Sequence, residues 1–198
     1  MARTVRETAR RRATRAKIVE AALEEFGRNG IDATSVEQLC EAAGFTRGAF
    51  YSNFDTKNDV CAAVARYIAD EYVEACRSAL ASATNDTDIG ELLGRLFSAG
   101  AFSPERQRTM VELQLRASRE PALSERLALA REETWPLIVE VVDHGAAQAD
   151  CTFAMDTHDL LRLCEALFFS PLLTADGSNL RLMSRVLEAL AVENHPVG

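Results

Sequence analysis

The stretch that most constrains the fold of this chain is residues 34–54, TSVEQLCEAAGFTRGAFYSNF. Its first half carries apolar residues at helical spacing. Thr34 can cap this helix, and Glu37 three positions later completes a capping box. Gly44 can take the positive φ that ends the helix. The pattern predicts two short helices joined by a tight turn.

The second helix of this stretch has one inward and one outward face. Thr46 is its expected N-cap. Phe50 and Phe54 are four residues apart, so both should face the core. The remaining positions should then be exposed, namely Thr46, Arg47, Gly48, Tyr51 and Ser52. This is the layout of a helix-turn-helix, whose second helix enters the major groove.

Arg47 is the best candidate for reading a base, because a guanidinium can donate two hydrogen bonds to a guanine edge. Gly48 costs helix stability, which makes sense where a helix backbone must approach DNA closely. Lys57 and the N-terminus of the first helix suit phosphates. The expected DNA-binding residues are Thr34, Ser35, Thr46, Arg47, Gly48, Tyr51, Ser52, Lys57, Arg11 and Arg12.

Charge is unevenly distributed along the chain. The net charge is −8, yet residues 1–17 carry seven basic residues against Glu7, a net of +6. We interpret residues 1–13 as a mobile basic arm that reaches along phosphates or into the minor groove. The acidic remainder should repel DNA and so orient the molecule on it.

The segment from Ala22 to Lys57 resembles the DNA-binding head of the TetR family of bacterial transcriptional regulators. The family usually has Leu where Phe50 stands, and His or an aromatic residue where Asn53 stands. The resemblance implies that Tyr51 contacts phosphate. It also implies a homodimer built from the last two helices of each chain. The matching residues are Phe26, Gly30, Thr34, Val36, Ala43, Gly44, Gly48, Phe50, Tyr51, Phe54 and Lys57.

Composition and periodicity predict an all-α protein of about nine helices, because glycine and proline are scarce and alternating β-branched runs are absent. We expect a basic arm and helix-turn-helix domain over residues 1–57 and a helical ligand-binding and dimerisation domain over 58–198. The expected helices after the motif begin near residues 57, 89, 104, 122, 158 and 179, and the first helix covers 14–28.

The last two predicted helices carry more apolar surface than one helix pair can hide, so one stripe should face a second copy. The expected dimer residues are Leu160, Cys164, Leu167, Leu180, Met183, Leu187 and Leu190. Two-fold symmetry would then require a palindromic operator.

A pocket for a small apolar or amphipathic effector is expected among the body helices. Trp135 is the best single candidate, because Pro136 should kink its helix and leave a carbonyl unbonded. Ordinary core packing is an equally good interpretation for each of these residues. The expected lining is Phe97, Met110, Leu113, Trp135, Ile138 and Phe168.

Several classes of function fit poorly. No apolar run is long enough for a membrane span and no secretory signal is recognisable, so we expect a cytoplasmic protein. The five cysteines form no C-x-x-C pair and should be reduced. His144, Cys151 and His158 match no zinc spacing, so neither a metal nor a cofactor is expected. No nucleophile or phosphate-loop motif indicates an enzyme.

The sequence therefore predicts a homodimeric repressor that a small-molecule effector releases from a palindromic operator. One alternative is a helix-turn-helix dimer that binds DNA without a small-molecule ligand. A more distant alternative is a helical enzyme or adaptor that does not bind DNA.

Overall fold

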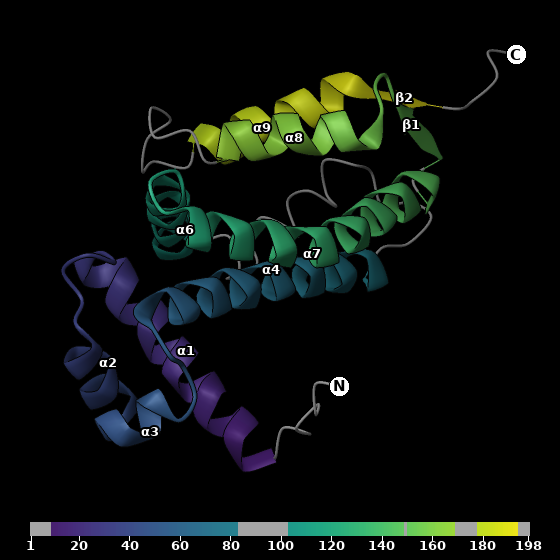
Figure 1. Cartoon of the computed structure of the whole chain (residues 1–198). Coiled ribbons are helices and arrows are strands. Elements are labelled where there is room, and N and C mark those ends of the chain that lie inside the picture. Colours follow the sequence, from purple (N-terminus) through teal and green to yellow (C-terminus); the bar gives the residue numbers. More distant parts are fainter. Residues whose placement is uncertain (1–8, 83–102, 149, 169–177, 194–198) are drawn as a thin grey trace, which may run out of the picture. The chain divides into compact units, whose positions relative to one another are not determined.

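The computed structural model describes residues 9–82, 103–148, 150–168 and 178–193. This described part contains eight helices and two short strands, so the predicted all-α class is confirmed; the helix expected near residues 89–101 lies outside it. The elements are α1 (Ala9–Asn29), α2 (Val36–Ala43), α3 (Arg47–Tyr51), α4 (Lys57–Ala81), α6 (Pro104–Ala117), α7 (Pro121–Gln148), β1 (Cys151–Phe153), α8 (Thr157–Phe168), α9 (Ser178–Leu190) and β2 (Ala191–Glu193) (Figure 1).

The chain divides into two compact units. The head unit comprises residues 1–67 and 108–128, and the body unit comprises residues 68–107 and 129–198. Three helices, α4, α6 and α7, contribute residues to both units. The boundary expected between residues 57 and 58 follows chain order, whereas each compact unit combines segments that are distant in sequence.

The core of the head unit follows the helical periodicity of the sequence. Helix α1 buries one stripe of apolar residues, with Ile18, Ala22 and Phe26 at most 1% exposed. Phe50 and Phe54 are also buried, as predicted, and their ring centroids lie 5.9 Å apart. These aromatic rings attach the short α3 to the rest of the head unit.

Helix α1 begins earlier than the sequence predicted. The expected mobile arm reached residue 13, but residues 9–13 are helical. Arginine and alanine are strong helix formers, and no glycine or proline interrupts this stretch. The hydroxyl of Thr14, the expected first helical residue, donates to the carbonyl of Arg10 at 3.1 Å inside the helix.

The cap of α2 lies one residue later than predicted. Ser35 is the N-cap, and its Oγ accepts from the backbone N–H of Gln38 at 3.2 Å. The Gln38 side chain completes the capping box by accepting from the Ser35 N–H at 2.7 Å. Glu37 therefore has no part in the cap. At the other end, Gly44 adopts φ 71° as predicted and terminates α2.

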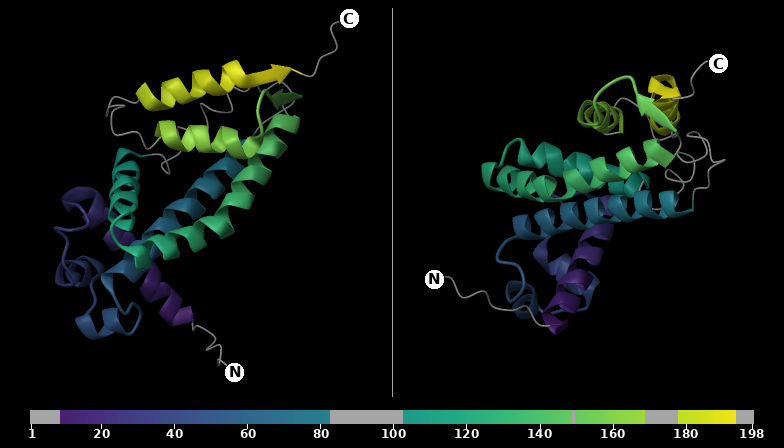
Figure 2. Two further views of the ribbon diagram at one scale, coloured as in Figure 1. Left: turned by 45° about the horizontal axis from the view of Figure 1, so that its top comes forward. Right: turned by 90° about the vertical axis from the view of Figure 1, so that its right-hand side faces the viewer.

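The body unit contains a small sheet that the sequence did not predict. Strand β1 pairs antiparallel with β2, and Thr152 lies opposite Val192. Figure 2 shows α8 and α9 side by side, with the two strands continuing from one end of this pair. Three-residue strands carry too little alternation to be recognised from sequence.

Candidate nucleic-acid interface

Helix α3 presents the outward residues that the helix-turn-helix interpretation requires. Thr46 caps α3, its Oγ1 accepting from the N–H of Ala49 at 3.2 Å. With Phe50 buried beneath the helix, one face is left at the surface. The exposed positions are Thr46, Arg47, Gly48, Tyr51 and Ser52. The five positions predicted to face DNA are thus all exposed on one short segment.

The Arg47 side chain contacts one side chain on α2 and another on its own helix, α3. Its Nη1 lies 2.6 Å from Oε1 of Glu37 on α2. The guanidinium carbon lies 5.8 Å from the centroid of the Tyr51 ring. Contact with the Tyr51 phenol and, to a smaller extent, the Glu37 carboxylate raise the pKa of Arg47, which stays charged. Sequence reasoning assigned Glu37 to a cap and missed this pairing.

The surface of α3 is open over Gly48, whereas the hydroxyl of Ser52 is already engaged in a hydrogen bond. A Cβ built on Gly48 would have only Thr46 Oγ1 nearby, at 3.8 Å, so the surface over Gly48 is open. The Ser52 hydroxyl donates to the Gly48 carbonyl at 2.7 Å. That bond leaves the Ser52 oxygen able to accept, but its proton is already used.

Thr34 does not belong to the DNA-facing surface. Its side chain is 0% exposed, and its hydroxyl donates to the Gly30 carbonyl at 2.8 Å. The Thr34 side chain is therefore not at the surface, and its contact with phosphate stays a prediction. Ser35, which is exposed, lies at the helix N-terminus in its place.

The basic residues predicted in a mobile arm lie on the first turns of α1. Arg11 and Arg12 are both exposed there. Arg15, one turn later, donates to the backbone carbonyl of Asn53 and stacks over the Phe54 ring at 4.2 Å. Arg15 therefore links α1 to Asn53 and Phe54, just after α3. This contact fixes the part of α1 that carries Arg11 and Arg12.

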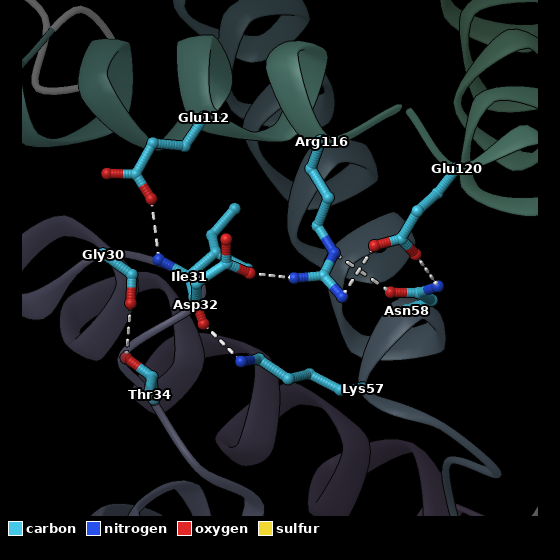
Figure 3. Close-up of polar contacts among 9 residues, drawn as sticks. All are labelled: Gly30, Ile31, Asp32, Thr34, Lys57, Asn58, Glu112, Arg116 and Glu120. Carbon is cyan, nitrogen blue, oxygen red and sulfur yellow. Dashed lines mark hydrogen bonds and ion pairs between the residues drawn. The ribbon is translucent and has the colours of Figure 1, made fainter. Parts of the chain in front are cut away.

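Lys57 points into the head unit rather than along its surface (Figure 3). Its Nζ donates to the backbone carbonyl of Ile31, in the loop between α1 and α2. Burial, followed by the charge of Arg116, lowers the pKa of the Lys57 ammonium. An ammonium has three donors, so the bond to Ile31 leaves donors that could bind a phosphate. The phosphate-binding role of Lys57 therefore remains a prediction.

Helix α6 holds the same loop through a set of polar contacts, which we call the loop clamp (Glu112 and Arg116 with residues 30–32). Oε2 of Glu112 accepts from the N–H of Ile31 at 2.6 Å. Arg116 pairs with Asp32, and its Nη2 lies 2.9 Å from Glu120 (Figure 3). Glu112 and Ile31 are more than 80 residues apart in sequence, and so are Arg116 and Asp32. No local pattern could have indicated them.

The effector pocket expected from the sequence is not tested by the described residues. Leu113 is buried, and Met110, Trp135 and Ile138 are half-buried. Phe97 lies outside the described residues, as does the side chain of Phe168. The Trp135 indole donates to Nδ1 of His158 at 3.0 Å, and Arg131 stacks over its ring at 4.2 Å.

A different pocket, of about 480 Å³, opens on the head unit. It lies between α1, the α3–α4 connection, α4 and the start of α7. None of the six residues expected around an effector belongs to it. Its lining is Arg11, Arg15, Asn53, Phe54, Asp55, Asp59, Ala62, Ala63, Arg66 and Arg126.

Three of the expected dimer residues are core residues of a single chain. Leu160, Met183 and Leu187 are at most 8% exposed and form one cluster between α8 and α9, with Cys164 and Leu190 packed against it. Such side chains offer a partner almost no surface. Leu163 and Leu182, which were not in the expected set, are exposed on the same two helices. The side chain of Leu180 lies outside the described residues, and Leu167 is half-buried.

The described residues contain no group of three or more His, Cys, Asp or Glu side chains arranged to hold a metal ion. No helix among them has an apolar stretch long enough to cross a bilayer. All five cysteines are free thiols.

Comparison with known sequences gives matches over part of the chain. A family model described as "Bacterial regulatory proteins, tetR family" matches residues 18–64. The HTH-type transcriptional regulator AcrR of Shigella flexneri is 40% identical over 60 residues, 30% of this chain and 27% of AcrR. The regulator SrpR of Pseudomonas putida is 43% identical over 51 residues, 26% of this chain and 24% of SrpR. These matches span about a quarter of each relative's own length.

Comparison with solved structures extends the likeness of fold beyond the head. E. coli NemR superposes with a TM-score of 0.69 at 15% identity, covering 92% of this chain and 100% of the NemR chain. A TetR transcription regulator from Haloarcula marismortui gives 0.69 at 19% identity, covering 91% and 100%. At such identities the shared property is the fold.

Proposed function

The chain belongs to the TetR family of bacterial regulatory proteins, and from that premise we propose that it is a homodimeric transcriptional repressor, released from a palindromic operator by a small-molecule effector. It would act in the cytoplasm, where bacterial DNA is. The observation that carries the DNA-binding part is the arrangement of α3. Phe50 and Phe54 are buried while Arg47, Gly48 and Tyr51 are exposed along one short helix.

Each exposed residue of α3 has a role in this proposal. Arg47 donates to guanine O6 and N7 in the major groove. Tyr51 and Thr46 contact phosphates and fix the register without reading sequence. Gly48 lets the helix backbone approach the DNA. Arg11 and Arg12 add phosphate contacts from α1, and each makes binding more sensitive to salt.

Selection of bound duplexes from a random pool tests this function. The wild-type chain should enrich a palindromic sequence, and Arg47→Ala should relax the preference at one base position per half-site. Tyr51→Ala should weaken binding to all sequences alike, because a phosphate contact carries no base information. A pool that stays random at moderate salt would contradict the proposal.

The homodimer is supported by the fold shared with TetR regulators and by apolar side chains left exposed on α8 and α9. Leu163 and Leu182 are 36% and 37% exposed. We place the interface on these outward residues rather than on the buried cluster. A two-fold dimer would present two α3 helices to half-sites one helical turn apart.

The effector response is supported by the loop clamp. Helix α6 contributes residues to both compact units and contacts the loop that leads into α2. A ligand in the body that moved α6 or α4 would therefore disturb the position of α3. A coupling of about 1–3 kcal/mol would weaken operator binding roughly 5–150-fold.

A thermal-shift screen against apolar and amphipathic compounds separates this repressor from a DNA-binding dimer that has no small-molecule ligand. A ligand that binds only the folded chain must raise its melting temperature. The compound that does so should also release the selected operator. If no compound stabilises the protein, the ligand-independent alternative is favoured.

A further inference from the structure

The carboxylate of Glu37 holds the side chain that is proposed to read the operator. Glu37 lies in the first turn of α2, and its Oε1 is 2.6 Å from Nη1 of Arg47 on α3. The capping box of α2 uses Ser35 and Gln38, so capping does not explain a glutamate at this position. The side chains of Glu37 and Arg47 are 58% and 61% exposed.

Stability does not explain this ion pair either. A pair so exposed contributes on average about 0–1 kcal/mol to folding. On a surface that meets DNA, a carboxylate also repels phosphates and lowers affinity for every sequence alike. The Glu37 carboxylate thus lowers affinity for all DNA and adds little to folding stability. A role in discriminating between DNA sequences would account for it.

The geometry of a guanidinium allows such a role. Arginine has five N–H donors in one plane, more than a single carboxylate contact uses. Arg47 can therefore keep Glu37 at Nη1 while its other donors bind a guanine edge. To bind a phosphate of unrelated DNA instead, the side chain would have to turn away from Glu37.

Resting on the proposed DNA-binding function, we propose that Glu37 is a specificity-determining residue that acts by positioning Arg47. Glu37 directs the guanidinium toward the base edges and disfavours its contact with phosphates. In operator DNA the Glu37–Arg47 pair is retained. In unrelated DNA the pair must break or leave Arg47 unused, so the discrimination between operator and unrelated DNA is larger than Arg47 alone would give.

The test compares affinities of full-length variants for two duplexes, the operator selected by the wild-type chain and a scrambled duplex of equal length, by fluorescence anisotropy over a series of salt concentrations. Glu37→Gln should raise affinity for the scrambled duplex more than for the operator. The ratio of the two affinities should fall by a factor of about 5 to 150, the range that one well-oriented base contact accounts for. The salt slope for the scrambled duplex should steepen by about one for each bound subunit, because each Arg47 gains a phosphate.

Glu41→Gln is the matched control. Glu41 is an exposed carboxylate on the same helix, and the same charge is removed there. It should raise both affinities equally and leave their ratio unchanged. Glu37→Ser is a second variant, since glutamine could rebuild a neutral hydrogen bond to Arg47. Its loss of discrimination should be at least as large, and its melting temperature should fall by no more than about 2–4 °C, since the pair contributes at most about 1 kcal/mol.

The Arg47→Ala background shows whether Glu37 acts through Arg47. There, adding Glu37→Gln should leave the affinity ratio unchanged. The inference is overturned if Glu37→Gln and Glu41→Gln behave alike, or if Glu37→Gln still lowers the ratio without Arg47. Failure of the wild-type chain to select any operator would instead overturn the proposed function.

Discussion

Three glycines of the head unit serve different physical purposes. Gly44 has φ +71° and ends α2, and an L side chain there would be strained although the space is open. Gly30 has φ +84°, and a Cβ on it would meet the Glu112 carboxylate at 3.3 Å. Gly48 has neither constraint, because it is helical and faces open space. A glycine that the fold does not need is a candidate for function.

Gly48→Ala should therefore separate stability from DNA binding. Alanine at an exposed helical position should raise the free energy of unfolding by about 0.5–1 kcal/mol. Operator affinity should fall, because the added methyl group separates α3 from the DNA. Denaturant titration and anisotropy measure the two effects. Gly44→Ala is the control and should lower stability. Unchanged operator affinity in Gly48→Ala would mean that the DNA does not come close to this backbone.

Cys61 makes stability depend on alkaline pH. The side chain is 0% exposed, and burial raises the pKa of its thiol from 9.0 to about 11, although Arg116 and Lys57 act in the opposite direction. The folded state therefore holds this proton more tightly than the unfolded state does. The resulting stabilisation is complete below pH 9 and is lost as pH rises from 9 to 11. By linkage the loss is roughly 2–3 kcal/mol for this one group.

Unfolding by urea at several pH values between 8 and 11 checks this prediction. Cys61→Ala should lose less stability over that range than the wild type, even though its stability at pH 8 is lower. Burial also raises the pKa values of Cys76 and Cys164 to about 11, so part of the pH dependence should remain in the variant. Parallel curves for the two proteins would show that Cys61 does not titrate as its burial implies.

Among the elements, α6 makes contacts within the head unit that its place in the sequence does not indicate. The loop clamp engages the loop between α1 and α2 through one carboxylate and one guanidinium. Arg116 also donates to Oδ1 of Asn58 in α4 at 3.3 Å. One side chain of α6 thereby contacts both segments that flank the helix-turn-helix motif, and a movement of α6 would reach both.

Arg116→Ala tests the loop clamp. Hydrogen bonds to charged groups contribute about 1.5–3 kcal/mol each at partly buried sites, so stability should fall by that order. The pKa of Lys57 should rise, because Arg116 lowers it in the wild type. Denaturant titration and NMR titration of the lysine side chains measure both effects. Arg119→Ala, an exposed arginine just beyond α6, should change neither. An unchanged Lys57 titration would exclude close electrostatic contact with Arg116.

At the scale of the whole molecule, charge and apolar surface are distributed unequally. Residues 1–17 have a net charge of +6 although the chain has −8. Among the described side chains of α8 and α9, two leucines remain exposed after the buried faces have packed against each other. The first property suits one end of the molecule to DNA. The second suits another part of it to a second copy.

Leu163→Glu and Leu182→Glu should each convert the proposed dimer to a monomer, because a buried carboxylate at an apolar interface is costly. Light scattering after gel filtration should give one chain mass instead of two. Operator affinity should fall about 100-fold or more, as expected when two linked contacts become one. Leu115→Glu, on α6, is the control and should remain a dimer. Dimers in all three variants would place the interface elsewhere.

Local features of the head unit could be read from the sequence because each depends on residues a few positions apart. The burial of Ile18, Ala22 and Phe26 follows from helical spacing within one element. The αL conformation of Gly44 and the cap at Thr46 are fixed by neighbouring backbone groups. The error at the cap of α2 was small. Either Thr34 or Ser35 could cap α2, and a hydrogen bond from Thr34 to the Gly30 carbonyl decided between them.

Only the tertiary structure decided which apolar stripe of a helix is buried. It also decided which charged and polar groups distant in sequence come into contact. Leu160 and Met183 fit an outward or an inward stripe equally well until α8 packs against α9. Glu112 reaches Ile31 across 81 residues, and Lys57 turns to the same loop rather than to the surface. The sequence by itself determined the helices and the recognition motif, because their contacts are local. The loop clamp, the Glu37–Arg47 pair and the core of the α8–α9 pair depend on contacts between elements, which only folding brings together.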